Sequence, residues 1–184
     1  MTASVYWHDD RVAIRPYQPG DAQPLYAAIQ ESAAHVSAWL PDYGDLSFED
    51  VADYIAVQPE VWARGKAYNF AIVDHVSGDI LGGCGLSQLN TRHRFANLFY
   101  WVRSSRTGQG IATRSVRLLA RFGFEFLDLR RVEIVVVAGN LASARVAHKA
   151  GACREGVLRN RICMRGVSYD ALMFSLIPAD LEDT

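Results

Sequence analysis

The sequence predicts an α/β fold built on a mixed, mostly antiparallel sheet of about seven strands, with helices on its faces. Two observations carry this prediction. Runs of alternating or continuous apolar residues, typical of strands, are interspersed with runs in which apolar residues recur at helical spacing. In addition, three strand-like runs follow one another in mid-chain and two more flank Arg165-Gly166, which predicts an antiparallel meander and a closing hairpin. Such a mixture of periods indicates a layered α/β architecture.

The N-terminal third is expected to form one strand and then helices. Residues 12–17 form a short strand-like run. Asp21 can cap the helix that follows, which should end by Trp39-Leu40-Pro41 because proline cannot continue it. Ser47 begins a further helix, since an acidic residue stands at the capping-box position three residues on. We expect Pro59 to break or kink that helix.

The rest of the chain alternates strands with two more helices. The expected elements are strands at 68–73, 80–86 and 95–102, a helix at 111–126, a strand at 132–138, a helix at 141–150, and strands at 153–162 and 169–176. Gly151 is a natural residue to end the last helix, because glycine readily adopts the left-handed conformation. We find no internal repeat and no low-complexity linker, so the sequence predicts one domain over residues 1–184.

Composition and charge exclude several classes of protein. Half of the residues are hydrophobic and 21% are charged, as in an ordinary globular protein. The formal net charge is -1, so neither nucleic acid nor an anionic membrane is expected as a partner. The N-terminal stretch MTASVYWHDDRVAIRP has no signal-peptide pattern, and no apolar run approaches the roughly 20 residues that span a bilayer.

The cysteines predict a reducing environment. Cys84, Cys153 and Cys163 are odd in number and widely separated, without CxxC spacing. The histidines do not fall at ligand spacing with them, so we expect no structural metal. A cytoplasmic protein without disulfides is the expectation that follows.

A glycine-rich turn separates the expected strand at 95–102 from the helix at 111–126. Its sequence is Arg106-Thr107-Gly108-Gln109-Gly110-Ile111-Ala112, followed by Thr113. Glycines let the backbone approach a phosphate closely, and the first amides of a helix have no internal acceptors. The turn is neither a Walker loop nor a G-x-G-x-x-G dinucleotide fingerprint. It is therefore a candidate phosphate cradle, with a tight connection that binds nothing as the alternative.

A second helix start follows the expected strand at 132–138. Asn140 is suited to cap this helix, and Ser143 falls in its first turn. Simple capping explains these residues without any ligand. However, two helix N-termini that each follow a strand of parallel type mark the crevice where open sheets bind ligands. The two turns together therefore predict one ligand site.

With these residues the sequence resembles the GNAT superfamily of N-acetyltransferases. The phosphate turn, the strand at 132–137, the stretch N-L-A-S-A-R-V-A-H-K-A-G-A and the following R-E-G-V-L-R occur in the family's order, and the resemblance covers residues 12–178. Trp39-Leu40-Pro41, F-Y-W-V, N-L-A-S and S-Y-D are similar to the RimJ/RimL type, which acetylates α-amines of ribosomal proteins. The resemblance implies a sheet splayed at its centre and acetyl-CoA as co-substrate.

The resemblance also implies where the coenzyme binds. Pantetheine should lie in the splay between the strands that end at Val102 and Ala138, hydrogen-bonded to the backbone near Trp101, Val102 and Arg103. Pyrophosphate should lie on the amides of residues 108–113. Asn140 should contact the coenzyme arm and Ser143 should lie beside the thioester sulfur. The implied coenzyme contacts are Trp101, Val102, Arg103, Thr107, Gly108, Gln109, Gly110, Ile111, Ala112, Thr113, Asn140 and Ser143.

The implied chemistry is direct attack of a neutral amine on the thioester. Many GNAT enzymes protonate the leaving thiolate with a tyrosine four residues after the position of Ser143, where this chain has Ala147. As in the RimJ/RimL type, Ser143 becomes the expected acid. Many family members also carry a glutamate base on the aromatic-rich strand, where Asn97 is the nearest polar residue here. Asp170 is the first candidate for the missing base.

Glu155, His148 and a water in the splay remain alternative bases, and a paired structural role remains the alternative for Asp170.

The resemblance places the acceptor groove between the early helices and the C-terminal hairpin, with His35, Trp39 and Tyr43 as expected substrate contacts. Trp39 is equally well explained as a core residue. Residues 159–165 are also expected to line the groove, and the basic residues 159–161 within them could attract an acidic substrate or form a solvated hairpin face. Arg114, Arg145 and Lys149 could contact the coenzyme 3′-phosphate or form a charged helix stripe that needs no ligand.

The acceptor itself stays open at this stage. A protein N-terminus, or a small amine such as a polyamine, an amino acid or an antibiotic, is compatible with the sequence. A module that binds acyl-CoA without catalysis is the rival class. A homodimer is possible, since related enzymes often form one.

Overall fold

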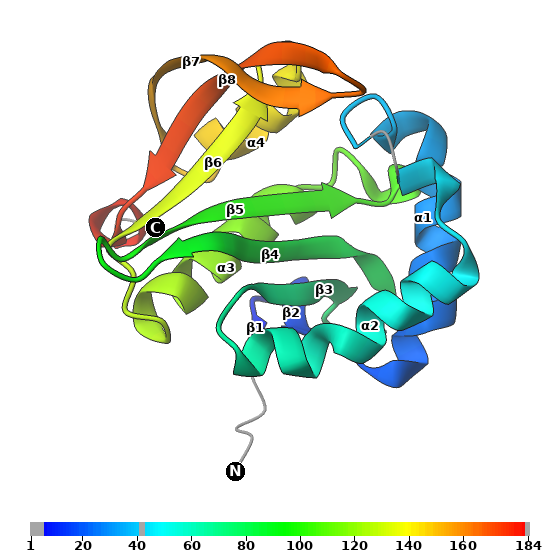
Figure 1. The fold of residues 1–184 in the computed structure, drawn as a ribbon. Helices are drawn as coiled ribbons and strands as arrows, with labels where there is room; N and C mark the ends of the chain where they lie inside the picture. Colours follow the sequence, from blue (N-terminus) through cyan, green and yellow to red (C-terminus); the bar gives the residue numbers. More distant parts are fainter. Residues whose placement is uncertain (1–5, 41–42, 183–184) are drawn as a thin grey trace.

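The computed structural model describes residues 6–40 and 43–182, and its centre is one open sheet flanked by helices (Figure 1). The sheet has eight strands in the order β1-β2-β3-β4-β5-β6-β8-β7. The strands are β1 (Trp7–His8), β2 (Val12–Pro16), β3 (Tyr68–Asp74), β4 (Ile80–Asn90), β5 (Phe95–Val102), β6 (Arg131–Val137), β7 (Cys153–Met164) and β8 (Val167–Leu176). The α-helices are α1 (Ala22–Val36), α2 (Phe48–Ala63), α3 (Ile111–Glu125) and α4 (Leu141–Lys149). Four short 3-10 turns are η1 (Pro19–Asp21), η2 (Tyr43–Asp45), η3 (Ser104–Arg106) and η4 (Pro178–Leu181).

The predicted α/β class and the mostly antiparallel sheet are confirmed. The expected meander is β3-β4-β5, and the expected hairpin is β7-β8, which turns through Arg165 and Gly166 at positive φ. The expected count of about seven strands becomes eight because the two-residue β1 pairs with β2. Pro41, which was expected to stop the first helical region, lies outside the described residues. Helix α1 itself ends earlier, at Val36.

The splay at the centre of the sheet is confirmed where β5 meets β6. These two strands are parallel and pair only between residues 95–97 and 131–133. Beyond that point they diverge, as Figure 1 shows for the green β5 and the yellow β6. The Arg103 N–H donates to the Leu81 carbonyl of β4 at 2.9 Å. Because backbone groups alternate between the two edges of a strand, those of residues 98, 100 and 102 face the splay.

Two hydrophobic layers cover the faces of the sheet. On one face, α1 and α2 bury Leu25, Ile29 and Ile55 against a cluster that includes the Trp101 indole. On the other face, α3 and α4 cover the larger cluster, in which Phe122 of α3 is fully buried. The alternation of β5 therefore sends Trp101 towards α1 and α2, and its sequence neighbours towards α3 and α4.

The prediction that Pro59 breaks or kinks its helix is wrong as to a break, because α2 continues past it to Ala63. The predicted capping box is present, and the Asp50 N–H donates to Ser47 Oγ at 3.1 Å. Tertiary packing holds the last turn: the Trp62 ring centroid lies 5.1 Å from that of Tyr68 and 4.9 Å from that of Phe70. These contacts of the partly buried Trp62 ring compensate for the hydrogen bond that proline cannot donate.

One position of β4 must be glycine because the backbone of β5 passes very close to it. Gly82 pairs with Val102, and a Cβ atom at Gly82 would lie 2.1 Å from the Trp101 carbonyl oxygen. No side chain fits at that distance without moving the backbone of β5. Gly82 thus keeps β4 and β5 together directly behind the splay.

Candidate active site

A cavity of about 890 Å³ opens in the splay between β5 and β6. Its walls are formed by the facing parts of both strands, the glycine turn before α3 and the first turn of α4. The lining residues of these segments are 97–102, 106–108, 110–113, 134–137 and 139–143. This is the volume range of small-molecule and cofactor sites. The two helix starts that the sequence singled out therefore open onto one cavity.

The glycine turn has the backbone conformation of an anion cradle. Gly108 and Gly110 have φ of +75° and +79°, and a Cβ at either position would meet nothing within 4 Å. Glycine is required here by the left-handed backbone and not by crowding. The Arg114 N–H donates to the Gly110 carbonyl at 3.1 Å, which is the first bond of α3. The amides of residues 111–113 therefore lack helical acceptors and are oriented to bind phosphate.

Two side chains of this turn stabilise it through hydrogen bonds to backbone carbonyls of η3. Thr107 Oγ1 donates to the Ser104 carbonyl at 2.9 Å, and Gln109 Nε2 donates weakly to the Ser105 carbonyl at 3.4 Å. Gln109 is not among the residues that line the cavity, whereas the other predicted residues of the turn are. Thr107 thus has a structural bond and also lines the cavity.

The Arg103 side chain is bound to α1, and the backbone contact with the coenzyme suggested at this residue stays a prediction. Its side chain forms an ion pair with Glu31 of α1, with Nε 3.1 Å from Oε2, and it does not line the cavity. Glu31 also accepts from the Ser105 N–H at 2.9 Å. The bonds from Arg103 and Ser105 lower the pKa of Glu31 to about 2. This carboxylate therefore anchors the start of the glycine turn to α1.

The anchor predicts an acid-dependent loss of stability. The pKa of Glu31 falls from 4.5 to about 2 on folding, so its contribution is fully present above pH 4.5 and is lost as the pH falls towards 2. We expect the stability difference between wild type and Glu31→Gln to shrink over that window. Urea unfolding of both proteins at pH 7, 5 and 3 measures it. A difference that does not change with pH would show that the ionised form of Glu31 is not what matters.

The second helix start both caps α4 and presents a hydroxyl to the splay. The Ser143 N–H donates to Asn140 Oδ1 at 3.0 Å, so the capping interpretation is correct for Asn140. Ser143, Asn140 and the preceding Gly139 all line the cavity as well. The capping and ligand interpretations are therefore compatible.

Removing the Asn140 cap should destabilise the fold. Asn140→Ala is expected to lower the free energy of unfolding by about 1 kcal/mol, because the Ser143 amide loses its acceptor. Asn140→Asp replaces the amide oxygen with a carboxylate oxygen that can accept the same bond, and it should retain stability. Thermal unfolding measures both variants, and equal losses in the two would contradict the capping account.

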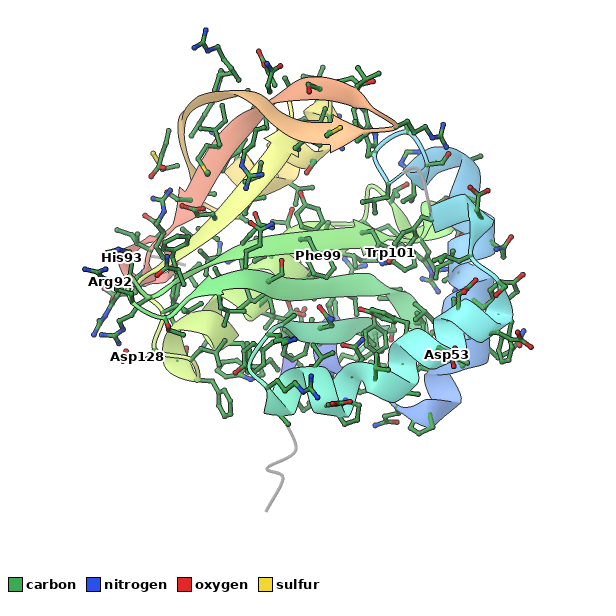
Figure 2. The ribbon with its side chains drawn as sticks, in the orientation of Figure 1. Asp53, Arg92, His93, Phe99, Trp101 and Asp128 are labelled. Atoms are coloured by element: carbon green, nitrogen blue, oxygen red, sulfur yellow. The ribbon has the colours of Figure 1, made fainter. Side chains whose placement is uncertain are left out.

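The structure adds Tyr100 of β5, which sequence reasoning missed. Its hydroxyl oxygen lies 2.8 Å from Ser143 Oγ and 3.1 Å from the Ser143 carbonyl oxygen. Burial raises the pKa of Tyr100 to about 12, although the bond to Ser143 opposes the rise. Alternation along F-Y-W-V placed this side chain on the α4 face, but only the fold shows that it meets Ser143. Figure 2 labels Phe99 and Trp101, its neighbours on β5, whose side chains alternate with it.

The candidate bases lie apart from the cavity. Asp170 of β8 is exposed and accepts from the Asn160 N–H at 2.9 Å. Glu155 accepts from Arg131 Nη1 at 2.6 Å, and that pairing, together with Ser175, lowers its pKa to about 2. His148 is exposed on α4, and none of the three is among the described lining residues. The catalytic role of Asp170 stays a prediction that this placement does not favour.

Asn97 marks the closed end of the splay. Its Oδ1 is buried and, within the described residues, has no hydrogen-bond partner. Asn97 lines the cavity at the last paired position of β5 and β6. A buried oxygen without a partner accepts a donor readily.

The predicted acceptor residues divide into two groups. His35 and Trp39 line the cavity, and Trp39 lies against the backbone at Gly139. Tyr43 instead packs edge-on against Trp101, with ring centroids 5.4 Å apart, and burial raises its pKa. It is not among the lining residues, and its substrate contact stays a prediction.

The basic residues suggested for the 3′-phosphate also divide. Arg145 and Lys149 of α4 line the cavity. Arg114 of α3 instead pairs with Asp9 at 2.7 Å and with Asp10 at 2.6 Å. These aspartates satisfy its charge away from the splay, so the suggestion for Arg114 is not supported.

Comparison with known proteins decides the family. The family described as Acetyltransferase (GNAT) domain matches residues 11–152, which include the glycine turn, Tyr100 and the start of α4. The chain belongs to the GNAT acetyltransferases. It is an acetyl-CoA-dependent N-acetyltransferase of the RimJ/RimL type.

Individual relatives agree with this assignment. YdaF of Bacillus subtilis (strain 168), whose name places it among ribosomal N-acetyltransferases, is 28% identical over 181 residues, or 95% of each chain. Spermidine N(1)-acetyltransferase of Escherichia coli (strain K12) is 27% identical over 95 residues, 52% of this chain and 51% of that protein. The structure of Mycobacterium smegmatis RimJ in complex with CoA-disulfide has a TM-score of 0.85 at 24% identity, covering 94% of this chain and 85% of that one, and it shows the same fold.

The fit of coenzyme A to this GNAT site rests on the chain's own geometry. A long ligand with a pyrophosphate matches three features of the site: a left-handed glycine turn with open space beside it, free helix amides, and a cavity between two diverging strands.

Among residues 6–40 and 43–182, no helix is long and apolar enough to cross a membrane. The same residues contain no cluster of three His, Cys, Asp or Glu side chains that could hold a metal ion.

Proposed function

We propose that this N-acetyltransferase acetylates the α-amine of a polypeptide, a ribosomal or another protein. One observation carries the proposal: no Asp or Glu is among the described residues that line the cavity. An α-amine has a pKa of about 8, so an appreciable fraction is neutral near pH 7.5 without help from a base. An alkylamine has a pKa of about 10.4, and only about one molecule in a thousand would be neutral.

The same site supports direct attack. The neutral amine enters between Trp39 and β5 and attacks the thioester carbon. A backbone amide on the splayed edge of β5, at residue 98, 100 or 102, can donate to the resulting oxyanion. The carbon–sulfur bond then breaks, and Ser143 donates a hydrogen bond to the departing thiolate. A water in the splay takes the amine proton, which suits the lining better than Asp170 does.

A polyamine acceptor is the second candidate, because a spermidine acetyltransferase is among the relatives. A polycation is held best by several carboxylates, since each desolvated ammonium needs a partner. The described lining carries the basic side chains of His35, Arg106, Arg145 and Lys149 and no acidic group. The geometry therefore favours an acceptor with one reactive amine.

Thiol release with a matched set of acceptors tests the proposal. The first acceptor is a peptide with a free α-amine and no lysine. The second is the same peptide with an acetylated N-terminus and one internal residue changed to lysine. Spermidine is the third acceptor. We expect release of free thiol with the first peptide and little above background with the others. Preference for spermidine would support the polyamine alternative. Calorimetric binding of acetyl-CoA without thiol release from any acceptor would support a non-catalytic binder.

A further inference from the structure

The Tyr100–Ser143 contact joins the two walls of the splay. Tyr100 belongs to β5 and Ser143 to the first turn of α4, 43 positions further along the chain. The phenol oxygen lies 2.8 Å from Ser143 Oγ and 3.1 Å from the carbonyl oxygen of the same serine. Both partners line the cavity, and the proposed acetyl transfer places the leaving sulfur beside Ser143.

The phenol has one proton and two acceptors for it. If Tyr100 donates to the Ser143 carbonyl, the short contact to Oγ requires the serine to donate to the phenol oxygen. The serine proton is then turned away from the splay. If Tyr100 donates to Oγ instead, the serine proton is free to point at a ligand. In that state the Ser143 carbonyl gives up the hydrogen bond from Tyr100 but still accepts one from the backbone amide four residues further along α4.

We propose that Tyr100 is a positioning residue for Ser143: its hydroxyl donates to Ser143 Oγ and thereby directs the serine proton at the leaving sulfur. This inference rests on the proposed acetyl transfer. Ala147 stands where many relatives have an acid tyrosine, and it is fully buried. The phenol in this chain comes from the opposite wall and acts through the serine.

The proton balance of the step follows. The amine nitrogen forms a bond to the acetyl carbon, and the carbon–sulfur bond breaks with its electron pair on sulfur. Ser143 and Tyr100 stabilise that thiolate through two hydrogen bonds in series, and the proton lost by the amine finally neutralises it. Burial keeps Tyr100 protonated, since its pKa of about 12 lies well above the roughly 8.5 of a thiol. Tyr100 therefore stays a donor throughout and never ionises.

Four variants test this assignment: Tyr100→Phe, Ser143→Ala, the double variant, and Tyr68→Phe as a control that removes a phenol of β3. All are assayed at saturation with whichever acceptor the wild type acetylates, so the test does not depend on the peptide proposal. We expect kcat to fall about 100-fold for Ser143→Ala and about tenfold for Tyr100→Phe. The dissociation constant for acetyl-CoA should change less than about twofold, and the control should match wild type.

The double variant is decisive. If Tyr100 acts through Ser143, the double variant has the kcat of Ser143→Ala alone. Multiplied losses, or an unchanged kcat in Tyr100→Phe, would overturn the positioning role. A tenfold loss that appears in KM or in coenzyme binding with kcat intact would overturn it too. A basic limb in the pH profile of kcat that disappears in Tyr100→Phe would show ionisation of the phenol and contradict the assignment. If the wild type acetylates no acceptor, both the proposed function and this inference fail.

Discussion

Ser143→Ala should lower kcat about 100-fold while leaving coenzyme binding intact. The hydroxyl is the only group removed, and the Ser143 N–H that donates to Asn140 is a backbone group that alanine keeps. The helix cap and the shape of the cavity are therefore preserved. Steady-state thiol release gives kcat, and calorimetry with acetyl-CoA gives the dissociation constant.

Ser168→Ala is the matched control for this experiment. Ser168 is exposed on β8, where it pairs with Cys163 of β7, and it does not line the cavity. Its kcat should equal that of wild type. If Ser143→Ala also turns over at the wild-type rate, Ser143 does not stabilise the leaving thiolate, whatever its position beside Tyr100.

Gly82→Ala should cause the largest loss of stability, about 3 kcal/mol. The added Cβ would lie 2.1 Å from the Trp101 carbonyl and 3.0 Å from the Val102 Cα, and both are backbone atoms that cannot rotate away. Relief requires β4 and β5 to separate beside the cavity. Urea unfolding measures the change in free energy.

Gly156→Ala separates this clash from the general effect of placing alanine in a strand. Gly156 lies in β7, and a Cβ there would meet nothing within 4 Å. Its free energy of unfolding should stay within about 0.5 kcal/mol of wild type. Similar losses in the two variants would show that the close approach at Gly82 is not what requires glycine.

Local patterns predicted most of the fold because they involve neighbouring residues. The meander, α3 and the β7-β8 hairpin follow from periodicity and from turn residues such as Arg165-Gly166. Strand β1 is too short to show a period, and only pairing with β2 reveals it. Helix α2 continues past Pro59 because Trp62 packs against β3, and this contact between distant segments could not be predicted from the proline alone.

In the candidate site, too, local features were predictable and contacts between distant segments were not. The cradle and the cap at Asn140 are local, and the sequence located both. Contacts between distant segments were not predictable from one sequence: Tyr100 with Ser143, Arg103 with Glu31 at a separation of 72 positions, and Arg114 with Asp9 at a separation of 105. Each of these contacts depends on which elements the fold brings together.

The most direct test of the account compares acetyl-CoA binding in Gly110→Ala and Gly166→Ala. Both glycines have positive φ, +79° and +76°, and open space for a Cβ, so both substitutions should cost about 1–2 kcal/mol of stability. Only Gly110 belongs to the cradle whose amides would hold the pyrophosphate. By calorimetry we predict acetyl-CoA binding at least tenfold weaker in Gly110→Ala and unchanged in Gly166→Ala. Wild-type affinity in both would contradict the assignment of this turn as the pyrophosphate site.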